Sequence, residues 1–555
     1  MPGFLSPPPR VRLVNAFGRP FDGVVAAART CYSPKGIVTP EEVAGDAIAD
    51  PAERERRRAR RDALARDVYL AGHHTTFQHA HFQFTLENVS RQLVWSFLHA
   101  HPFYNSEQTS QRYVEVKPGT FAVPPLAGEA LEVYRAACER QTLAYRRLGE
   151  LLVPVASRAF YGTFRGRESQ PARWEKAIRK RALEVARYVL PVATFTTLYH
   201  TVSAVTLFRY RRLAATFDAP TEQRLVVEAM TQELLRHDPA YAGVLEEPVP
   251  LEATPEFALA ERLFGGPRPD RPGDASFRAR FDAGLGGRIS RLVDRKARNE
   301  ELLAEAVREV VGISPEALSD DEAIALAIDP AGNTLLGEAL NLTDHGKLAR
   351  ALHHPAYTFR KKLSHTADSQ DQRHRTTPAS RPTLHAYLTD DPDYVTPMLL
   401  AEPGEAKALY DETMERTWEA IRRLRTLGVP DEFAPTFSRT PSRCASPSRP
   451  TSPASATSSP CASASTHRRR SGARPSTRPN RCGRWSRASA AGSSPPAGCA
   501  PAPARSPSAP RASVSAASSS GRRTSRTTGA SSDAERTPGS GPKPCIVCDN
   551  TRFLT

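Results

Sequence analysis

Two segments that lie far apart in the chain carry the arginine, histidine and hydroxyl side chains that suit an anionic ligand. The first, NSEQTSQRYVEV, contains Ser110 and Arg112, and the second, SHTADSQDQRHRTTPASRPT, contains the triplet Arg373-His374-Arg375. Guanidinium groups hold a phosphate or a carbonyl group with paired, charge-assisted hydrogen bonds and stay charged at neutral pH. Side chains of these types could therefore bind and polarise a phosphorylated substrate.

Paired histidines offer a competing interpretation. His79 and His81 are separated by one residue, as are His99 and His101. Two imidazoles on one strand can share a metal ion, as in a metal-dependent hydrolase. No carboxylate-rich third element accompanies these pairs, so the sequence favours no metal site.

The elements that must position these residues follow from the periodicity of apolar residues. A strand is predicted over 81–89, because Phe82, Phe84 and Leu86 recur at every second position, and the spacing turns helical over 90–98. The other expected elements are a short strand over 11–16 and helices over 24–30, 53–67, 127–155 and 173–213, followed by a second series of helices over roughly 285–430. The helix over 53–67 is expected to present a solvated, charged face.

Proline and glycine cluster in GGPRPDRPGDA, residues 265–275, which is the expected linker. It separates a first module, 1–264, from a second, 276–434. We predict an α+β fold in which each module has a small, mostly antiparallel sheet flanked by long helices.

The composition changes abruptly near Ala434. From Pro435 onward there are 19 Lys and Arg against 3 Asp and Glu, which gives the whole chain's net charge of +16. Residues 1–434 balance 57 basic against 57 acidic groups, so the body of the chain shows no charge bias toward nucleic acid. The segment 435–555, rich in Ser, Arg, Pro and Ala, is expected to be a disordered tail.

Six of the eight cysteines also lie in that tail, leaving Cys31 and Cys138 in the body. Two cysteines make no disulfide framework and fit a reducing cytosol. The N-terminus lacks the apolar core of a signal peptide, and no apolar run approaches the length of a membrane span. We expect a soluble, cytoplasmic protein.

The order of motifs resembles the flavin-dependent thymidylate synthases. That family carries a His, an alternating strand, Ser-Arg, Arg-His-Arg, then Ser-x-Arg-Tyr and Ala-Arg-x-x-Leu-Pro. The first half is similar to this pattern at His79, Ser90, Arg91, Ser110, Arg112, Tyr113 and, in ARYVLP, Arg187.

Each half departs from the family pattern where the other half keeps it. Nine residues after Ser90 stands His99-Ala100-His101 instead of Arg-His-Arg, and Ser203 and Val205 replace the family's flavin-contacting Asn and Arg. In the second half, Arg373-His374-Arg375 stands nine residues after Ser364, but the Arg-Tyr pair that should follow Thr383 is missing.

The resemblance implies one composite site built by both halves. It implies catalytic roles for Arg373, His374 and Arg375, substrate contacts from Gln370, Glu107, Ser110, Arg112, Arg187 and Thr383, and cofactor contacts from His79, Arg91, His374 and Arg375. The implied reaction is reductive methylation of dUMP to dTMP with FAD, NADPH and methylenetetrahydrofolate, in a protein that self-associates through module interfaces. The alternative is a non-catalytic scaffold that kept the fold and lost the chemistry.

The tail also admits a reading-frame hypothesis. Residues from Pro435 to Pro441 allow codons that, shifted by one base, spell Tyr-Leu-Leu-Pro-Asn-Ala. Residues from Ala462 to Gly472 likewise allow Ala-Gln-Glu-Glu-Ile. Both resemble family elements in the right order, so we predict that a frameshift near residue 435 replaced the closing segment of the second module.

Overall fold

A computed structural model describes residues 3–101, 103–215, 220–265, 275–336, 338, 340, 342, 345–371, 379–381, 390–433 and 439–447. All of them belong to one compact unit of the chain, Met1–Ser465. Most of the expected linker and the predicted frameshift position fall outside the described residues.

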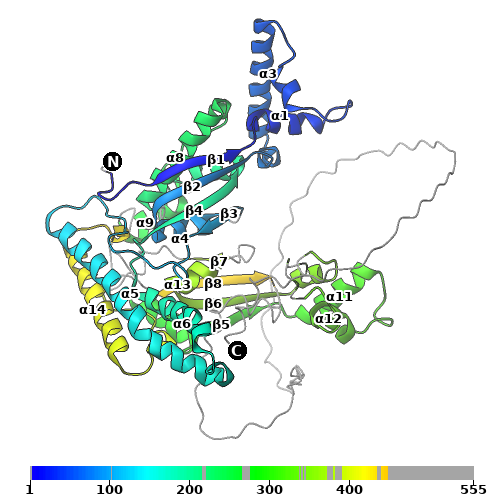
Figure 1. Cartoon of the computed structure of the whole chain (residues 1–555). Coiled ribbons are helices and arrows are strands. Elements are labelled where there is room, and N and C mark those ends of the chain that lie inside the picture. The colour runs from blue at the N-terminus through cyan, green and yellow to red at the C-terminus, as the bar shows by residue number, and fades with distance from the viewer. Residues whose placement is uncertain are drawn as a thin grey trace, which may run out of the picture. The chain divides into compact units, whose positions relative to one another are not determined.

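The first half is built on a four-stranded antiparallel sheet in the order β1-β2-β4-β3 (Figure 1). Its strands are β1 (Arg10–Ala16), β2 (His81–Ser90), β3 (Asn105–Gln108) and β4 (Phe195–Ser203). The predicted alternation on β2 is confirmed, because Phe82, Phe84 and Leu86 are all completely buried. They form the centre of the largest core together with apolar residues of the neighbouring helices.

The helices of the first half cover this sheet and extend from it. They are α1 (Pro20–Thr30), α2 (Pro40–Ala44), α3 (Pro51–Leu70), α4 (Arg91–Ala100), α5 (Gly128–Thr163), α6 (Pro171–Ala186), α7 (Ala204–Arg212), α8 (Thr221–His237) and α9 (Pro255–Phe264). Short 3-10 turns are η1 (His74–Gln78), η2 (Arg165–Arg167), η3 (Arg187–Val189), η4 (Pro239–Gly243) and η5 (Leu251–Ala253).

The second half repeats the arrangement with an antiparallel sheet in the order β5-β6-β8-β7. Its strands are β5 (Ser290–Arg295), β6 (Ala356–Ser364), β7 (Ala379–Ser380) and β8 (Arg439–Pro447). Its helices are α10 (Ala275–Leu285), α11 (Asn299–Val311), α12 (Asp320–Ile328), α13 (His365–Asp371) and α14 (Glu405–Thr426), with 3-10 turns η7 (Ala349–His353), η9 (Met398–Leu400) and η10 (Asp431–Phe433).

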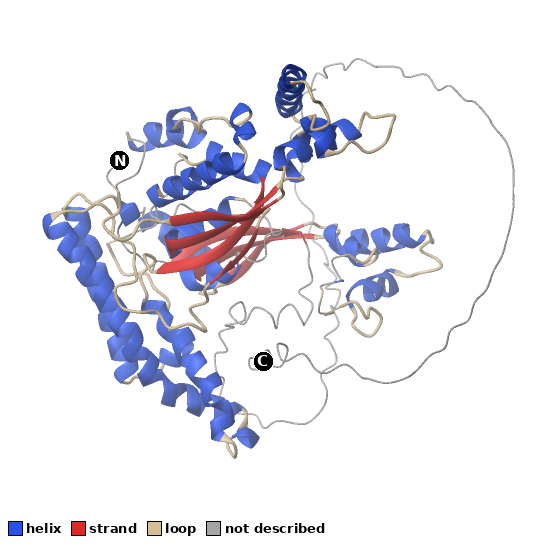
Figure 2. Cartoon of the chain, turned by 45° about the horizontal axis from the view of Figure 1, so that its top comes forward, coloured by secondary structure: helices blue, strands red, loops and turns tan. Residues whose placement is uncertain are grey.

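In both halves the second strand runs directly into a helix, β2 into α4 and β6 into α13, and both sheets place the last strand between the second and third. The strands stand out among the helices in Figure 2. The predicted α+β architecture with two small antiparallel sheets is therefore confirmed. Among the described helices, none is both long and apolar enough to cross a membrane.

Two secondary-structure predictions were wrong. The helices expected over 173–213 are interrupted by β4, and the series expected over 285–430 is interrupted by β5 and β6. The buried positions of β4 include Thr196 and His200 as well as Leu198 and Val202, so polar residues hide its period-two pattern. Residues 439–447, at the start of the expected tail, form strand β8, whose backbone pairs with β6.

A second core joins the halves. Helix α14 lies along α5, and α5 packs on α6, so that three helices run side by side (Figure 1). The completely buried Trp418, Met414 and Ile421 of α14 share one apolar cluster with Tyr145 and Leu148 of α5. This cluster fixes the second half to the long helix of the first.

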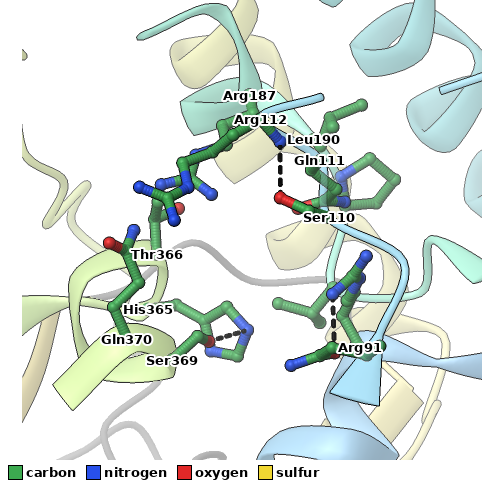
Figure 3. A pocket seen from close by; sticks show the side chains of 13 residues that line it. Arg91, Ser110, Gln111, Arg112, Arg187, Leu190, His365, Thr366, Ser369 and Gln370 are labelled. Atoms are coloured by element: carbon green, nitrogen blue, oxygen red, sulfur yellow. Dashed lines mark hydrogen bonds between the residues drawn. The ribbon is translucent and has the colours of Figure 1, made fainter. Parts of the chain in front are cut away.

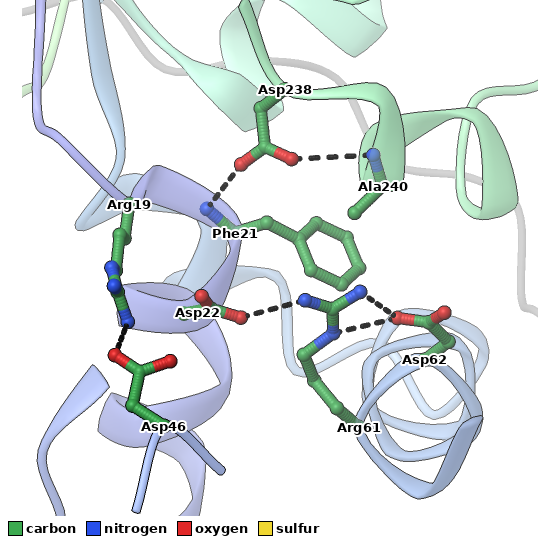
Figure 4. Close-up of polar contacts among 8 residues, drawn as sticks. All are labelled: Arg19, Phe21, Asp22, Asp46, Arg61, Asp62, Asp238 and Ala240. Atoms are coloured by element: carbon green, nitrogen blue, oxygen red, sulfur yellow. Dashed lines mark hydrogen bonds and ion pairs between the residues drawn. The ribbon is translucent and has the colours of Figure 1, made fainter. Parts of the chain in front are cut away.

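The charged helix α3 is largely exposed and contacts α1, α2 and η4. Ala65 is its buried residue, in agreement with the predicted solvated face, but Arg61 turns inward (Figure 4). Its guanidinium lies 2.9 Å from Asp22 and over the ring of Phe21, and both charged side chains are only about one-eighth exposed, at 14% and 12%. Asp238 accepts hydrogen bonds from the backbone of Phe21 and Ala240, which holds the same corner.

Replacing Arg61 with alanine should lower the free energy of unfolding by about 2 kcal/mol, because Asp22 would stay buried without its guanidinium. Urea unfolding followed by circular dichroism measures this change. Arg60→Ala, one position earlier on the exposed face of α3, is the matched control and should change it by less than about 0.5 kcal/mol. Equal losses of unfolding free energy in the two variants would contradict a specific role for the Arg61–Asp22 ion pair.

Candidate active site

A pocket lies between the two halves (Figure 3). The first half lines it with Arg91, Gln108, Ser110, Gln111, Arg112, Arg187, Leu190, Pro191 and Val192. The second half lines it with His365, Thr366, Ser369 and Gln370, all on α13. The pocket thus brings together segments of the two halves that lie far apart in the chain.

Arg91 enters the pocket from the start of α4, directly after β2. Its backbone N–H donates to the carbonyl of Thr194 at 3.0 Å, which ties α4 to the segment before β4. Its guanidinium donates from Nη1 to Oε1 of Gln108 at 2.7 Å and from Nη2 to the carbonyl of Thr109. Arg91 therefore joins the helix to the end of β3.

Arg112 and Arg187 approach from the opposite wall. The hydroxyl of Ser110 accepts the backbone N–H of Arg112 at 3.3 Å, so the turn after β3 aims this arginine. Glu184, a buried residue of α6, lies 3.6 Å from Nη1 of Arg112, and its carbonyl accepts Nε of Arg187 at 3.2 Å. Glu184 thus contacts two of the guanidinium groups that line the pocket, Arg112 through its carboxylate and Arg187 through its backbone carbonyl.

The pocket contains hydrogen-bond donors without acceptors. Nε of Arg91 and Nε2 of Gln370 are buried atoms that have no hydrogen-bond partner among the described residues. Burial, with the charge of Arg187 added, lowers the pKa of Arg91 to about 10, which leaves it charged at neutral pH. Buried donors of this kind fit a ligand that brings several oxygen acceptors and a negative charge.

Helix α13 is anchored beneath the pocket by a buried carboxylate. Asp368 is completely buried; its Oδ2 accepts the indole Nε1–H of Trp95 at 2.7 Å, and its Oδ1 lies 3.2 Å from Nε of Arg381. Trp95 belongs to α4 of the first half and Arg381 to the second. The same contact that joins the halves therefore orients both helices that line the pocket.

The sequence-predicted residues fall into three groups. Ser110, Arg112, Arg187, Arg91 and Gln370 line the pocket together. Glu107 and His79 do not: successive strand residues face opposite sides, so Gln108 points to the pocket, and His79 is exposed at the end of η1. Arg373, His374, Arg375 and Thr383 lie outside the described residues, so their roles stay predictions.

Sequence reasoning missed Gln108, Gln111, His365, Thr366 and Ser369. A signal for His365 was present, because it follows Ser364 as Arg91 follows Ser90. Aligning the two halves with each other would have placed it at the pocket. No motif or spacing in the sequence distinguishes Gln108 and Gln111 from other glutamines.

In the first half, the last residue of the segment that stands in place of Arg-His-Arg, His101, is buried against an arginine. The His101 side chain is 8% exposed, and its Nε2 lies 3.1 Å from Nη1 of Arg209. Burial and the charge of Arg209 lower the pKa of His101 to about 4, so the ring is neutral at physiological pH. In the part of the chain that the structure describes, no three His, Cys, Asp or Glu side chains are grouped to hold a metal ion.

A buried carboxylate holds the start of α4. Glu222 of α8 accepts the backbone N–H of Ser90 at 2.8 Å and also the Ser90 hydroxyl. The Ser90 hydroxyl in turn accepts the N–H of Leu93 at 3.0 Å, as a helix N-cap does. Burial raises the pKa of Glu222 from 4.5 to about 7, although the bonds from Ser90 favour its charged form.

The pKa of Glu222 predicts a pH-dependent stability. A carboxyl whose folded pKa exceeds its unfolded value stabilises the fold below about pH 4.5, and this contribution is lost as the pH rises toward 7. Between pH 5 and pH 8 the parent chain should therefore lose up to about 3 kcal/mol of unfolding free energy that a Glu222→Gln variant keeps. Denaturant titrations across this range measure the difference, and parallel pH profiles for the two proteins would contradict it.

Comparisons with known proteins match both halves. A family model described as "Thymidylate synthase complementing protein" matches residues 12–240 and 291–437. A flavin-dependent thymidylate synthase of Clostridium tetani is 26% identical over 233 residues, which cover 41% of this chain and 84% of that relative. One of Nitratidesulfovibrio vulgaris is 28% identical over 241 residues, covering 42% and 87%.

Two solved structures are similar at low identity. The UMP/dUMP methylase PolB of Streptomyces cacaoi, bound with 5-Br dUMP, is 20% identical with a TM-score of 0.28, covering 42% of this chain and 94% of PolB. The flavin-dependent thymidylate synthase of Helicobacter pylori, complexed with FAD and dUMP, is 16% identical with a TM-score of 0.29, covering 43% and 100%. Since the family model matches more than half of the chain and reaches into both halves, this chain belongs to the thymidylate synthase complementing protein family, the flavin-dependent thymidylate synthases.

Proposed function

We propose that this chain is an FAD-dependent thymidylate synthase that converts dUMP to dTMP. A methylene group from methylenetetrahydrofolate is transferred to C5 of the uracil, and the C5 hydrogen leaves as a proton. NADPH supplies the two electrons that reduce the methylene to a methyl group. The observation that carries this proposal is the convergence of three guanidinium groups and Gln370 on one pocket between the halves.

The residues of the pocket divide between the two ends of a nucleotide. Arg112 and Arg187, with the hydroxyl of Ser110, would hold the phosphate, because two positive charges and a hydroxyl match its oxygens. The Gln370 amide would bind the uracil edge, since an amide offers both a donor and an acceptor to a pyrimidine. Glu107 and Thr383 are also proposed to contact the substrate.

The pocket also suits a flavin. The buried Nε–H of Arg91 can donate to an oxygen of such a cofactor, and FAD, when bound, supplies the hydride that completes the methyl group. His79, His374 and Arg375 are proposed to contact the same cofactor. Arg373 would polarise the pyrimidine so that C5 becomes nucleophilic.

The proposal also covers the organisation of the chain into modules. We propose that residues 1–264 and 276–434 are the two modules, joined by 265–275, and that the chain works in the cytoplasm. Module interfaces would also support self-association. The segment 435–555 is proposed to be the product of a frameshift near residue 435 that replaced the closing segment of the second module.

One observation favours the alternative, a non-catalytic scaffold. His101 stands where the family has arginine, and it is buried against Arg209 instead of facing the pocket. A purified protein that is yellow with a flavin absorption spectrum would support the enzyme. A colourless protein that takes up no FAD on reconstitution would support the scaffold.

Arg112→Ala should weaken dUMP binding by about ten- to a hundredfold, because one charge-assisted contact to the phosphate is lost. Isothermal titration calorimetry on the full chain measures the affinity. Arg146→Ala is the matched control, since Arg146 also lies 3.6 Å from a glutamate, Glu115, but does not line the pocket. An equal effect of the two substitutions would contradict phosphate binding by Arg112.

The proposed reaction is tested by dTMP formation or by release of tritium from C5-labelled dUMP, with FAD, NADPH and methylenetetrahydrofolate. The assay is run on this chain and on a frame-corrected version, and we expect the corrected protein to be the more active. Resequencing the gene tests the frameshift itself, since an early stop codon in the shifted frame would contradict it.

A further inference from the structure

A carboxylate of the second half caps a helix of the first. Helix α8 begins after Pro220, whose side chain offers no acceptor to the free N–H groups of the first turn. Glu432 of η10 fills this role: its Oε2 accepts the N–H of Thr221 at 3.1 Å, and its Oε1 accepts the Thr221 hydroxyl at 2.8 Å. The negative charge lies at the positive end of the α8 dipole.

The same residue also reaches α4. The backbone carbonyl of Glu432 accepts Nε2–H of Gln92 at 2.9 Å. Its neighbour Asp431 is held by Arg425 near the end of α14, with Nε 3.0 Å from Oδ1. The turn η10 is therefore fixed to α14 and touches the first turns of both α8 and α4.

From the capped end of α8 a short series of contacts leads to the pocket. Glu222, the residue after Thr221, accepts both donors of Ser90. Ser90 is the N-cap of α4, and Arg91 is the first residue of that helix and lines the pocket. Each step is a hydrogen bond or a peptide bond, and Thr221 links the carboxylate of Glu432 to Glu222, the next residue of the chain.

We propose that Glu432 is a positioning residue: by capping α8 and binding Gln92 it sets, through Glu222 and Ser90, the place of Arg91 in the pocket. The inference rests on the proposed function for the identity of the ligand, dUMP. It makes the second half contribute to the pocket in two ways, directly through α13 and at a distance through η10. Glu432 itself does not line the pocket.

The test compares Glu432→Ala with Glu129→Ala on the full chain. Glu129 of α5 also pairs with the second half, through Nε of Arg423 at 2.6 Å, but it is exposed and touches neither α8 nor α4. Glu432→Ala should weaken dUMP binding in calorimetry by about tenfold. It should also speed amide hydrogen exchange at residues 90–93, whereas Glu129→Ala should do neither.

Glu432→Gln separates positioning from a general loss of stability. Its amide oxygen can still accept the N–H of Thr221, so this variant should restore most of the affinity that Glu432→Ala loses. In a double-mutant cycle that combines Glu432→Ala with Glu222→Gln, the two effects on dUMP affinity should not add, because both residues act on one path. Strict additivity, or equal effects of Glu432→Ala and Glu129→Ala, would overturn the proposal.

The two readouts also separate this proposal from the proposed function. If the parent chain binds no dUMP, the proposed function fails, and hydrogen exchange still decides the role of Glu432. Faster exchange at residues 90–93 in Glu432→Ala alone would then support the positioning of α4. Unchanged exchange in that variant would overturn it.

Discussion

The buried carboxylate of Asp368 is the constraint on which the composite pocket depends. A carboxylate without solvent is costly unless its oxygens are paired, and here Trp95 of one half and Arg381 of the other supply the partners. The indole N–H cannot satisfy Asp368 unless α4 and α13 lie against each other. The contact that docks the two halves is therefore also the contact that forms the pocket. The apolar cluster shared by α5 and α14 holds the halves together at a second place.

The fold class could be predicted because the clearest apolar alternation in the sequence falls on a central strand of the first sheet. The apolar alternation of Phe82, Phe84 and Leu86 marked the central strand β2, and the helix after it began where the spacing changed. Strand β4 was not predicted, because the polar residues Thr196 and His200 occupy two of its buried positions. Their burial depends on neighbouring strands and aromatic rings, which no window of sequence shows.

The pocket was predictable only in part. The order of motifs pointed to Ser110, Arg112, Arg187, Arg91 and Gln370, and all five line it. The contacts that hold them could not be predicted, since Glu184, Asp368 and Glu432 act through partners on other elements. Carboxylates of this kind look like surface residues in the sequence, and they become structural only when tertiary contacts remove the water around them.

Strand β8 is an inner strand of the second sheet, between β6 and β7. It falls in the segment whose composition is least like a folded protein, yet its backbone pairs with nine residues of β6 in register. Ladder bonds need only main-chain groups, but Pro441 and Pro447 have no N–H, so neither residue can donate a hydrogen bond to a neighbouring strand. Part of what holds the second half together must then come from outside its sheet, from the apolar cluster that α14 shares with α5.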